Sequence, residues 1–508
     1  MLALVAAGSA AGSACLRFDP FGCQEDTQCD AEAMGLCDAP SGYCTYPALE
    51  CATGYKYEAN AGDGLGGECV GTDPTGTGTG PSTSDATLPP LDTGPTDTTV
   101  STGPDLTGTS SDDEPTTGPA CGGAGQDCCT GDSCDAGLEC SEGLCGCVQA
   151  VSVGDRHTCV IKLDGSVWCW GANDLGQLAT DPVVTPSSPV PLAIAGVGPA
   201  PAITGLAARR HTCALRSDET LLCWGDNASQ KVDVMDPAAV VLVATAAPWA
   251  VPAMQLGVGG SHTCVGRGAR QAPACWGDNG SGQLTGVEVP GPAFVPGGFD
   301  PFAIAMGSAH TCMSTLTGQL FCWGANANGQ LAVDPAVTPT SNVPLSLGLP
   351  PVGTVSAGAD HTCATTGTDV QCWGRNNLGQ LGIGTNVDAF TPTLAAIPPG
   401  SGNVAALVAA ADQTCVVMVG GAVLCWGGNQ NGELLLEPDE TGEDGFALSP
   451  RPITLGFTVA QLATGVTHSC ALGTDGQVRC WGDNAQGQIG DGTVTDALEP
   501  TPAQISCP

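Results

Sequence analysis

The chain has 508 residues, too many for one compact domain unless that domain is a repeat array, so we expect several modules. Its formal net charge is −38, with 2 basic against 23 acidic residues over 1–147 and 11 against 28 over 148–508. A surface that is acidic throughout repels phosphate, which argues against nucleic acid and anionic lipid as partners.

Cysteine is unusually frequent, with 29 in the chain. The spacing suits disulfides better than metal sites, so we expect an oxidising compartment. The chain begins with an apolar, small-residue segment at 1–14 followed by Cys15, which resembles the cleavage region of a bacterial lipoprotein signal. No Lys or Arg precedes the apolar run, and Gly12 stands where such signals usually carry a Leu-like residue.

That resemblance implies a lipid on Cys15, and a plain or truncated secretory signal is the alternative. Either reading predicts an extracytoplasmic protein, secreted or held on the outer surface as a lipoprotein. The longest other apolar stretch, 238–254, has only about ten apolar residues before its first Pro, against the roughly 20 that a spanning helix needs. We therefore expect membrane contact only through the N-terminal lipid.

Two segments with little capacity for an apolar core come next. Residues 15–70 form a Cys-rich module that disulfides would have to stabilise, and with Cys15 lipidated its six other cysteines allow 15 connectivities, among which the sequence does not choose. Residues 71–120 are rich in Thr, Gly, Pro, Ser and Asp and contain no Lys, Arg, Cys or aromatic residue. We expect a disordered linker there, acting as a stalk.

Residues 121–147 are a second small Cys-rich module, with the spacing C-x6-CC-x4-C-x5-C-x4-C. This spacing resembles the inhibitor cystine knot family. The resemblance implies the pairs Cys121–Cys134, Cys128–Cys140 and Cys129–Cys145. Metal binding through CDAGLEC and CGC is the alternative, disfavoured because no His lies nearby.

The rest of the chain, 148–508, repeats one unit seven times. Its Cys-Trp-Gly tripeptide recurs at intervals of 54, 52, 47, 50, 53 and 55 residues, a period typical of a propeller or solenoid. Each copy has a strand ending in His-Thr-Cys or a near variant, a tight turn, and a second strand ending in Cys-Trp-Gly. Such short runs bounded by Gly, Asn and Asp predict an all-β module.

The two cysteines of each copy are 9 to 11 residues apart. A three-residue turn at Leu163–Gly165, with Gly165 left-handed, would place Cys159 opposite Cys169 in an antiparallel pair, within reach of a disulfide. The same reasoning predicts one disulfide in every copy: Cys159–Cys169, Cys213–Cys223, Cys264–Cys275, Cys312–Cys322, Cys363–Cys372, Cys415–Cys425 and Cys470–Cys480.

The recurring Trp and His could be read as a sugar-binding platform and as a metal or catalytic cluster. The Trp of each Cys-Trp-Gly points away from the Cys face, so we expect it to pack between neighbouring copies. The six His all occupy one slot of the repeat, and Gln413 fills that slot in the sixth copy. Because Gln keeps hydrogen bonding but loses titration and most metal affinity, a structural role is favoured, with no catalytic residue, metal or cofactor expected.

These residues resemble the repeat of the regulator of chromosome condensation (RCC1-like) family. The stretch HTCATTGTDVQCWGRNNLGQLGIGT at 361–385 carries its His-Thr strand, Trp-Gly-x-Asn and Gly-Gln-Leu-Gly turn, and similar copies span about 150–490. The resemblance implies a seven-bladed β-propeller of four-stranded blades, which seven copies independently suggest. The second copy, CWGDNASQKV, lacks Gly-Gln-Leu, so we expect an altered loop there. Joining the first and last blades suggests a Cys147–Cys507 disulfide.

The family's founder exchanges nucleotide on a small GTPase and binds chromatin, but an acidic, disulfide-bonded, exported chain should meet neither partner. Other members are secreted binding proteins. We therefore expect a monomeric, non-enzymatic propeller that binds a protein partner through variable insertions at 181–202, 231–254, 285–302 and 435–450. Acidic residues at 434–450 could receive a basic partner. The alternatives are a lyase or hydrolase with convergent carboxylates in the channel, and a purely structural surface protein.

Overall fold

The structure, a computed structural model, describes residues 146–506 except 199, 234, 237, 248–252, 269–270, 287–290, 298 and 437–444, and before 146 only the backbone of five short strands. Three of those strands lie in one unit, Ser13–Pro115, while every later element belongs to a second unit. The expectations for segment 1–14, Cys15, the linker 71–120, the cystine-knot pairs and Cys507 lie outside the described residues.

The early strands form two small antiparallel sheets. In the first unit, β1 (Leu36–Asp38), β2 (Tyr43–Pro47) and β3 (Tyr55–Tyr57) pair in that order. In the second unit, β4 (Glu139–Ser141) pairs with β5 (Leu144–Gly146), and the register sets Cys140 opposite Cys145.

The repeats fold as seven four-stranded antiparallel sheets, each made of four consecutive strands. The first three blades are β6 (Val148–Val153), β7 (His157–Lys162), β8 (Val167–Ala172), β9 (Ser187–Ala193); β10 (Ile203–Ala208), β11 (His211–Arg216), β12 (Leu221–Asp226), β13 (Val240–Ala246); and β14 (Gln255–Val258), β15 (His262–Gly266), β16 (Ala274–Gly277), β17 (Ala293–Phe294). The fourth and fifth are β18 (Pro301–Met306), β19 (His310–Thr315), β20 (Leu320–Ala325), β21 (Thr340–Ser346); and β22 (Val352–Ala357), β23 (His361–Thr366), β24 (Asp369–Gly374), β25 (Ala389–Leu394). The last two are β26 (Val404–Ala410), β27 (Gln413–Met418), β28 (Val423–Gly428), β29 (Phe446–Ile453); and β30 (Val459–Thr464), β31 (His468–Gly473), β32 (Val478–Gly482), β33 (Ala497–Pro502).

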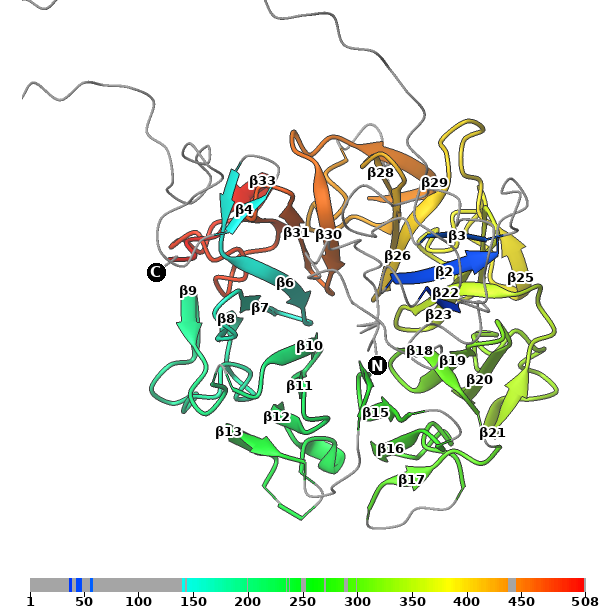
Figure 1. Ribbon diagram of the computed structural model, residues 1–508, viewed down its shortest axis with the longest axis horizontal. Helices are drawn as coiled ribbons and strands as arrows, with labels where there is room; N and C mark the ends of the chain where they lie inside the picture. The colour runs from blue at the N-terminus through cyan, green and yellow to red at the C-terminus, as the bar shows by residue number, and fades with distance from the viewer. Residues whose placement is uncertain are drawn as a thin grey trace, which may run out of the picture. The chain divides into compact units, whose positions relative to one another are not determined.

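These sheets form the seven-bladed all-β propeller that the repeats predict. Figure 1 shows the blades in a ring, with first strands such as β10, β18 and β26 toward the centre and fourth strands such as β13 and β21 toward the outside. The hairpin between the second and third strands is tight, with Gly165 at a φ of 77° in the first blade, a conformation that glycine adopts without a steric penalty.

Each hairpin holds its two cysteines directly opposite one another, as Cys159 and Cys169 are in the first blade. All seven predicted pairs lie at disulfide distance, with Cα atoms 4.0 to 4.1 Å apart. Closing so short a loop stabilises the fold by about 2 to 3 kcal/mol in the chain-entropy model. Each blade is thus held in register from within.

The apolar core lies between neighbouring blades. One cluster, for example, joins Ile161 and Val167 of the first blade to Leu206 and Trp224 of the second. All seven Trp of the Cys-Trp-Gly tripeptides are at most 2% exposed, which agrees with the inter-blade packing that strand alternation predicts. Among the described residues, no helix is long and apolar enough to cross a membrane.

The ring closes between the seventh and first blades through side chains and backbone. The Gln461 side chain bonds the main chain of Val151 twice, at 3.0 and 2.9 Å. Lys162 Nζ donates to the Ser506 carbonyl at 2.7 Å, so the C-terminal segment reaches back to the first blade. Cys147 is disulfide-bonded, while its proposed partner Cys507 is not among the described residues.

Candidate functional site

The repeated histidines form a ring of hydrogen bonds that link one blade to the next. Each His Nε2 lies 2.7 to 3.0 Å from the Thr Oγ1 that follows the His or Gln slot of the next blade. The pairs are His157–Thr212, His211–Thr263, His262–Thr311, His310–Thr362, His361–Thr414 and His468–Thr158. Because the last pair joins blade seven to blade one, this network runs around the ring.

The threonines fix the protonation of the histidines. In five of the six pairs the Thr hydroxyl donates its proton to a backbone carbonyl, as Thr414 does to Gln380 at 2.9 Å. Its oxygen is therefore free to accept only, so the His must carry its proton on Nε2. Each Nδ1 is buried with no hydrogen-bond partner.

Burial keeps these imidazoles neutral. Desolvation lowers the pKa of His157 to about 4 and those of His262, His310, His361 and His468 to about 3. The pKa of His211 is also lowered well below its ordinary value, first by burial and then by the charge of Lys231. The slot thus supplies neutral donors at neutral pH.

The sixth blade shows what the slot requires. Gln413 Nε2 donates to the Gly465 carbonyl at 2.8 Å, so the amide replaces the imidazole as the donor to the seventh blade. In the seventh blade, Ser469 occupies the position that Thr has in the other blades, and its hydroxyl donates to the Glu433 carbonyl. The link between blades is kept while the acceptor changes.

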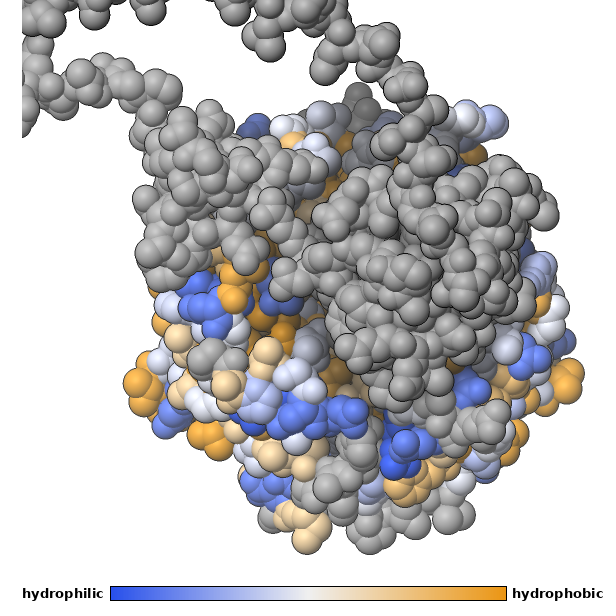
Figure 2. Space-filling model, in the orientation of Figure 1, coloured by the Kyte–Doolittle hydropathy of each residue, from blue (hydrophilic) through white to orange (hydrophobic). Residues whose placement is uncertain are grey.

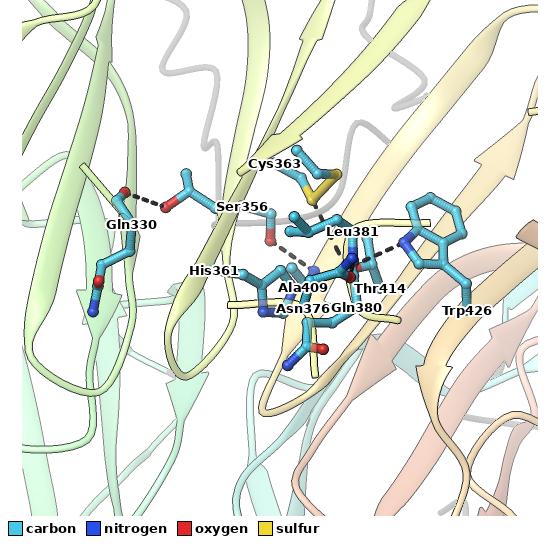
Figure 3. Close-up of a disulfide and its surroundings, with 12 residues drawn as sticks. Gln330, Ser356, His361, Cys363, Asn376, Gln380, Leu381, Ala409, Thr414 and Trp426 are labelled. Atoms are coloured by element: carbon cyan, nitrogen blue, oxygen red, sulfur yellow. Dashed lines mark hydrogen bonds between the residues drawn. A yellow bond between two sulfur atoms is a disulfide. The ribbon is translucent and has the colours of Figure 1, made fainter. Parts of the chain in front are cut away.

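In six of the seven blades, the Trp of Cys-Trp-Gly donates to the same carbonyl as the Thr or Ser that follows the His or Gln slot. Trp426 Nε1 and Thr414 Oγ1 both donate at 2.9 Å to the carbonyl of Gln380, the Gln of the preceding blade's Gly-Gln-Leu turn (Figure 3). All seven Trp make this bond to the equivalent residue. The recurring Trp are therefore interior anchors rather than an exposed platform.

The second copy keeps this bond although its turn differs, as expected from its lost Gly-Gln-Leu. A short 3-10 helix, η2 (Ala228–Gln230), precedes Lys231, whose carbonyl takes the Trp276 bond. Lys231 Nζ donates to Asp226 Oδ2 at 2.8 Å, and Arg210 Nε lies 3.1 Å from the same oxygen. Gln283 and Gln488 make the equivalent bond to Asp278 and Asp483.

The inner strands enclose a central channel cavity of about 130 Å³. All seven blades contribute to its wall, which consists mainly of Val, Leu, Ile, Met and Ala side chains. Among the described residues that line it, Arg209 is the one charged group, and no Asp or Glu is present. The convergent carboxylates that the enzyme alternative requires are thus not found in the described lining.

The variable insertions lie at the outside of the propeller. Segments 181–202, 231–254 and 285–302 contain the fourth strands β9, β13 and β17, and 435–450 leads into β29, so these stretches are outer strands with flanking loops. The coloured residues in Figure 2 include both hydrophilic and hydrophobic ones. No group of three or more His, Cys, Asp or Glu that could hold a metal occurs within the described part.

Exposed aliphatic side chains recur in the loop between the third and fourth strands. They occur in five blades, with 57 to 89% of each residue exposed: Val183, Val184, Met235, Val337, Val387 and Val494. In each antiparallel blade, the loop between the third and fourth strands lies at the same edge as the loop between the first and second strands. Because this edge is the same in every blade, the exposed residues lie on one face of the propeller. We call them the rim residues.

Two sequence profiles match the chain along the propeller, and both describe the regulator of chromosome condensation (RCC1) repeat. The first profile matches residues 148–177, 209–230, 303–330, 354–380 and 459–488. The second matches residues 317–365 and 369–418. RCC1 repeats are thus found along the propeller, in the matched segments. The matches cover blades in which the His, Thr, Trp and Gln contacts described above recur.

Known proteins are similar to parts of this chain. The ultraviolet-B receptor UVR8 of Arabidopsis thaliana is 35% identical over 204 residues, 39% of this chain and 44% of the receptor. The E3 ubiquitin-protein ligase HERC2 of Homo sapiens is 27% identical over 351 residues, 66% of this chain and 7% of the ligase. The chain thus spans less than half of either relative.

A solved structure shares the fold. The crystal structure of human WBSCR16 is similar with a TM-score of 0.58 at 20% identity, covering 67% of this chain and 95% of that one. At this level of identity the likeness concerns the propeller fold alone.

Sequence reasoning missed two features of the site. Each His pairs with the Thr of the next blade, about 50 positions away in the sequence, and no local sequence pattern predicts this pairing. Arg209 had a visible signal, because it stands two residues before His211, where the other copies have smaller or acidic residues. Which of the two arginines enters the channel depends on the loop, which buries Arg209 and leaves the Arg210 side chain 50% exposed.

Proposed function

We propose that the chain is an exported, non-enzymatic propeller that binds a protein partner through the rim residues, displayed on the stalk predicted for 71–120. The observation that carries this is the contrast between the blade interiors and the rim. Inside, the blades repeat the same buried contacts, apart from Gln413 in place of His in the sixth blade, whereas five blades expose aliphatic side chains where they meet solvent. Apolar side chains gathered on one face and bordered by polar ones favour a protein-binding surface.

Two further properties support the proposal. RCC1-like propellers are a fold type used for protein binding, and the disulfides of the seven blades indicate an oxidising environment. The net charge of −38 favours a partner with a basic surface, since opposite charge steers association. A rigid scaffold that presents variable loops suits recognition.

The test is retention of a partner from the extracellular fraction by the oxidised full chain. We expect the double variant Val337→Asp/Val387→Asp to retain at least tenfold less of that partner than the unmodified chain. The matched control is Val419→Asp, because Val419 is 67% exposed in a turn between the second and third strands, at the opposite edge of its blade. Equal loss with both variants, or no loss with either, would contradict a rim-mediated function.

A further inference from the structure

Arg209 is a charged side chain buried in the propeller's channel. It follows β10 directly, is 9% exposed and lines the central cavity. After burial, its positive charge is a further cause of the lowered pKa values of His262, His310 and His361, in the third to fifth blades. The field of Arg209 therefore extends across the channel.

The guanidinium is poorly satisfied by the protein. A guanidinium has five N–H donors, yet no side-chain hydrogen bond of Arg209 is found among the described residues, and its Nε is buried without an acceptor. Asp155 Oδ1 forms an ion pair with Arg209, 3.7 Å from Nε, but at this distance the two groups share no hydrogen bond, and Asp155 Oδ1 also lacks another hydrogen-bond partner. An ion pair without hydrogen bonds offsets the desolvation of a buried guanidinium only in part, so an anionic ligand would supply the missing acceptors.

A second unpartnered polar group lines the same cavity. Thr464, at the end of β30, is 6% exposed, and its Oγ1 has no hydrogen-bond partner. Of the other polar groups in the wall, Ser356 Oγ accepts from Ala409 N at 2.8 Å and both polar atoms of the Gln461 amide bond Val151. Ser152 also lines the cavity, and no side-chain hydrogen bond of Ser152 is found among the described residues. Arg209, Thr464 and Ser152 thus remain to bind a ligand.

The remaining wall selects against a bare inorganic ion. Most lining side chains are aliphatic, including Leu256, Ile304 and Val355. The volume of about 130 Å³ is close to that of an engineered apolar cavity of about 150 Å³ that binds benzene. A ligand that fills this space needs one anionic end and a short apolar body.

We propose that the channel binds a small organic monocarboxylate, with its carboxylate on Arg209 and its apolar part against the aliphatic wall. The Thr464 hydroxyl is an additional donor to the carboxylate. This site is separate from the rim residues, so it adds a small-molecule ligand to a protein that the rim would join to a macromolecular partner.

Calorimetric titration of the full oxidised chain tests the ligand class without any substitution. The probes are butyrate and benzoate, each compared with its neutral alcohol, 1-butanol or benzyl alcohol, and with inorganic sulfate. We expect each carboxylate to bind at least tenfold more tightly than its alcohol and than sulfate. If an alcohol binds as tightly as its carboxylate, Arg209 does not contribute to binding. If sulfate binds as tightly as the carboxylates, the apolar wall does not contribute.

Three substitutions test the residues. Arg209→Met keeps an unbranched side chain without charge and should weaken benzoate binding at least tenfold, while leaving benzyl alcohol unchanged. Arg156→Met is the matched control, because Arg156 lies in the first blade's loop with its side chain 42% exposed and paired to Asp174, and it should have no effect. Asp155→Asn removes the competing carboxylate and should tighten benzoate binding about threefold or more.

The wild-type comparison still decides the proposal if Arg209→Met fails to fold. No saturable carboxylate binding at 50 mM, unchanged benzoate affinity in a folded Arg209→Met chain, or weaker binding in Asp155→Asn would each overturn it. An unmodified chain that retains the rim-bound partner but binds no carboxylate would overturn this inference alone and leave the proposed function standing.

Discussion

At the scale of single residues, the histidine slot couples stability to pH. The imidazoles are neutral in the folded chain, with pKa values lowered by burial to about 3 or 4, whereas an unfolded His titrates near pH 6.5. Below about pH 6.5 the unfolded state therefore binds more protons than the folded state. The stabilisation is complete above that pH and is lost as the pH falls toward the folded values.

We predict that the free energy of unfolding falls between pH 6.5 and 4, by up to about 1.4 kcal/mol per pH unit for each buried histidine. Denaturant unfolding at a series of pH values measures this slope. A free energy that stays level or rises as the pH falls from 6.5 to 4 would show that the imidazoles are protonated in the folded ring.

The Gln that occupies the slot in the sixth blade suggests a substitution. We expect His361→Gln to cost less stability than His361→Ala, by about 1 to 2 kcal/mol at pH 7, because Gln can still donate to Thr414 Oγ1. His361→Gln should also lose the pH dependence of one histidine. Urea unfolding of both variants at pH 7 and pH 5 measures these differences. Equal losses of stability in the two variants would show that the imidazole has a role that Gln cannot replace.

At the scale of strands and hairpins, the Trp bond anchors each blade to the turn of the blade before it. We predict that Trp373→Phe costs about 1 to 3 kcal/mol, because it removes the Nε1 donor to the Gln330 carbonyl in a fully buried site. Trp168→Phe is the matched control, since Trp168 Nε1 bonds only the nearby Ser166 Oγ and the side chain is half-buried. Comparable losses in the two unfolding curves would refute the anchoring role.

Much of the hairpin formed by the second and third strands of each blade could be predicted from the sequence. The Cys spacing and the Leu163–Gly165 turn predict the hairpin register, because opposed positions in a tight antiparallel pair follow from turn length alone. Strand alternation likewise predicts that Trp faces away from Cys. The carbonyl of the Gly-Gln-Leu turn as shared acceptor for Trp and Thr could not be predicted, since it depends on how one blade sits against the next.

At the scale of the whole molecule, seven repeats predict seven blades, and the structure has seven blades in a ring. The sequence does not show whether the channel is polar or apolar. The first strands of the blades line the channel, and no residue pattern in them tells channel-facing side chains from buried ones. Arg209 enters the channel and Arg210 does not, a difference set by loop geometry rather than by residue type. The closing contacts of Gln461 and Lys162 are equally hidden, because each joins positions more than 300 residues apart.

The Cys147–Cys507 disulfide stays a prediction about this closure. Removing it in the double variant Cys147→Ser/Cys507→Ser should leave the ring folded, since Gln461 still bonds Val151 and His468 still contacts Thr158. We expect amide hydrogen exchange to become at least tenfold faster in β6 and β33, with β19 and β20 unchanged. Unchanged exchange in β6 and β33 would show that these two cysteines do not lock the ring.

The central claim is that each blade carries its own disulfide, with the His and Trp of the repeat serving as scaffold. Thiol titration of the unreduced, denatured full chain, combined with non-reducing peptide mapping, tests this claim most directly. We expect that none of the fourteen blade cysteines reacts and that seven cross-links each join cysteines 9 to 11 residues apart. Reactive thiols at most of these positions, bound zinc, or cross-links between different blades would contradict it.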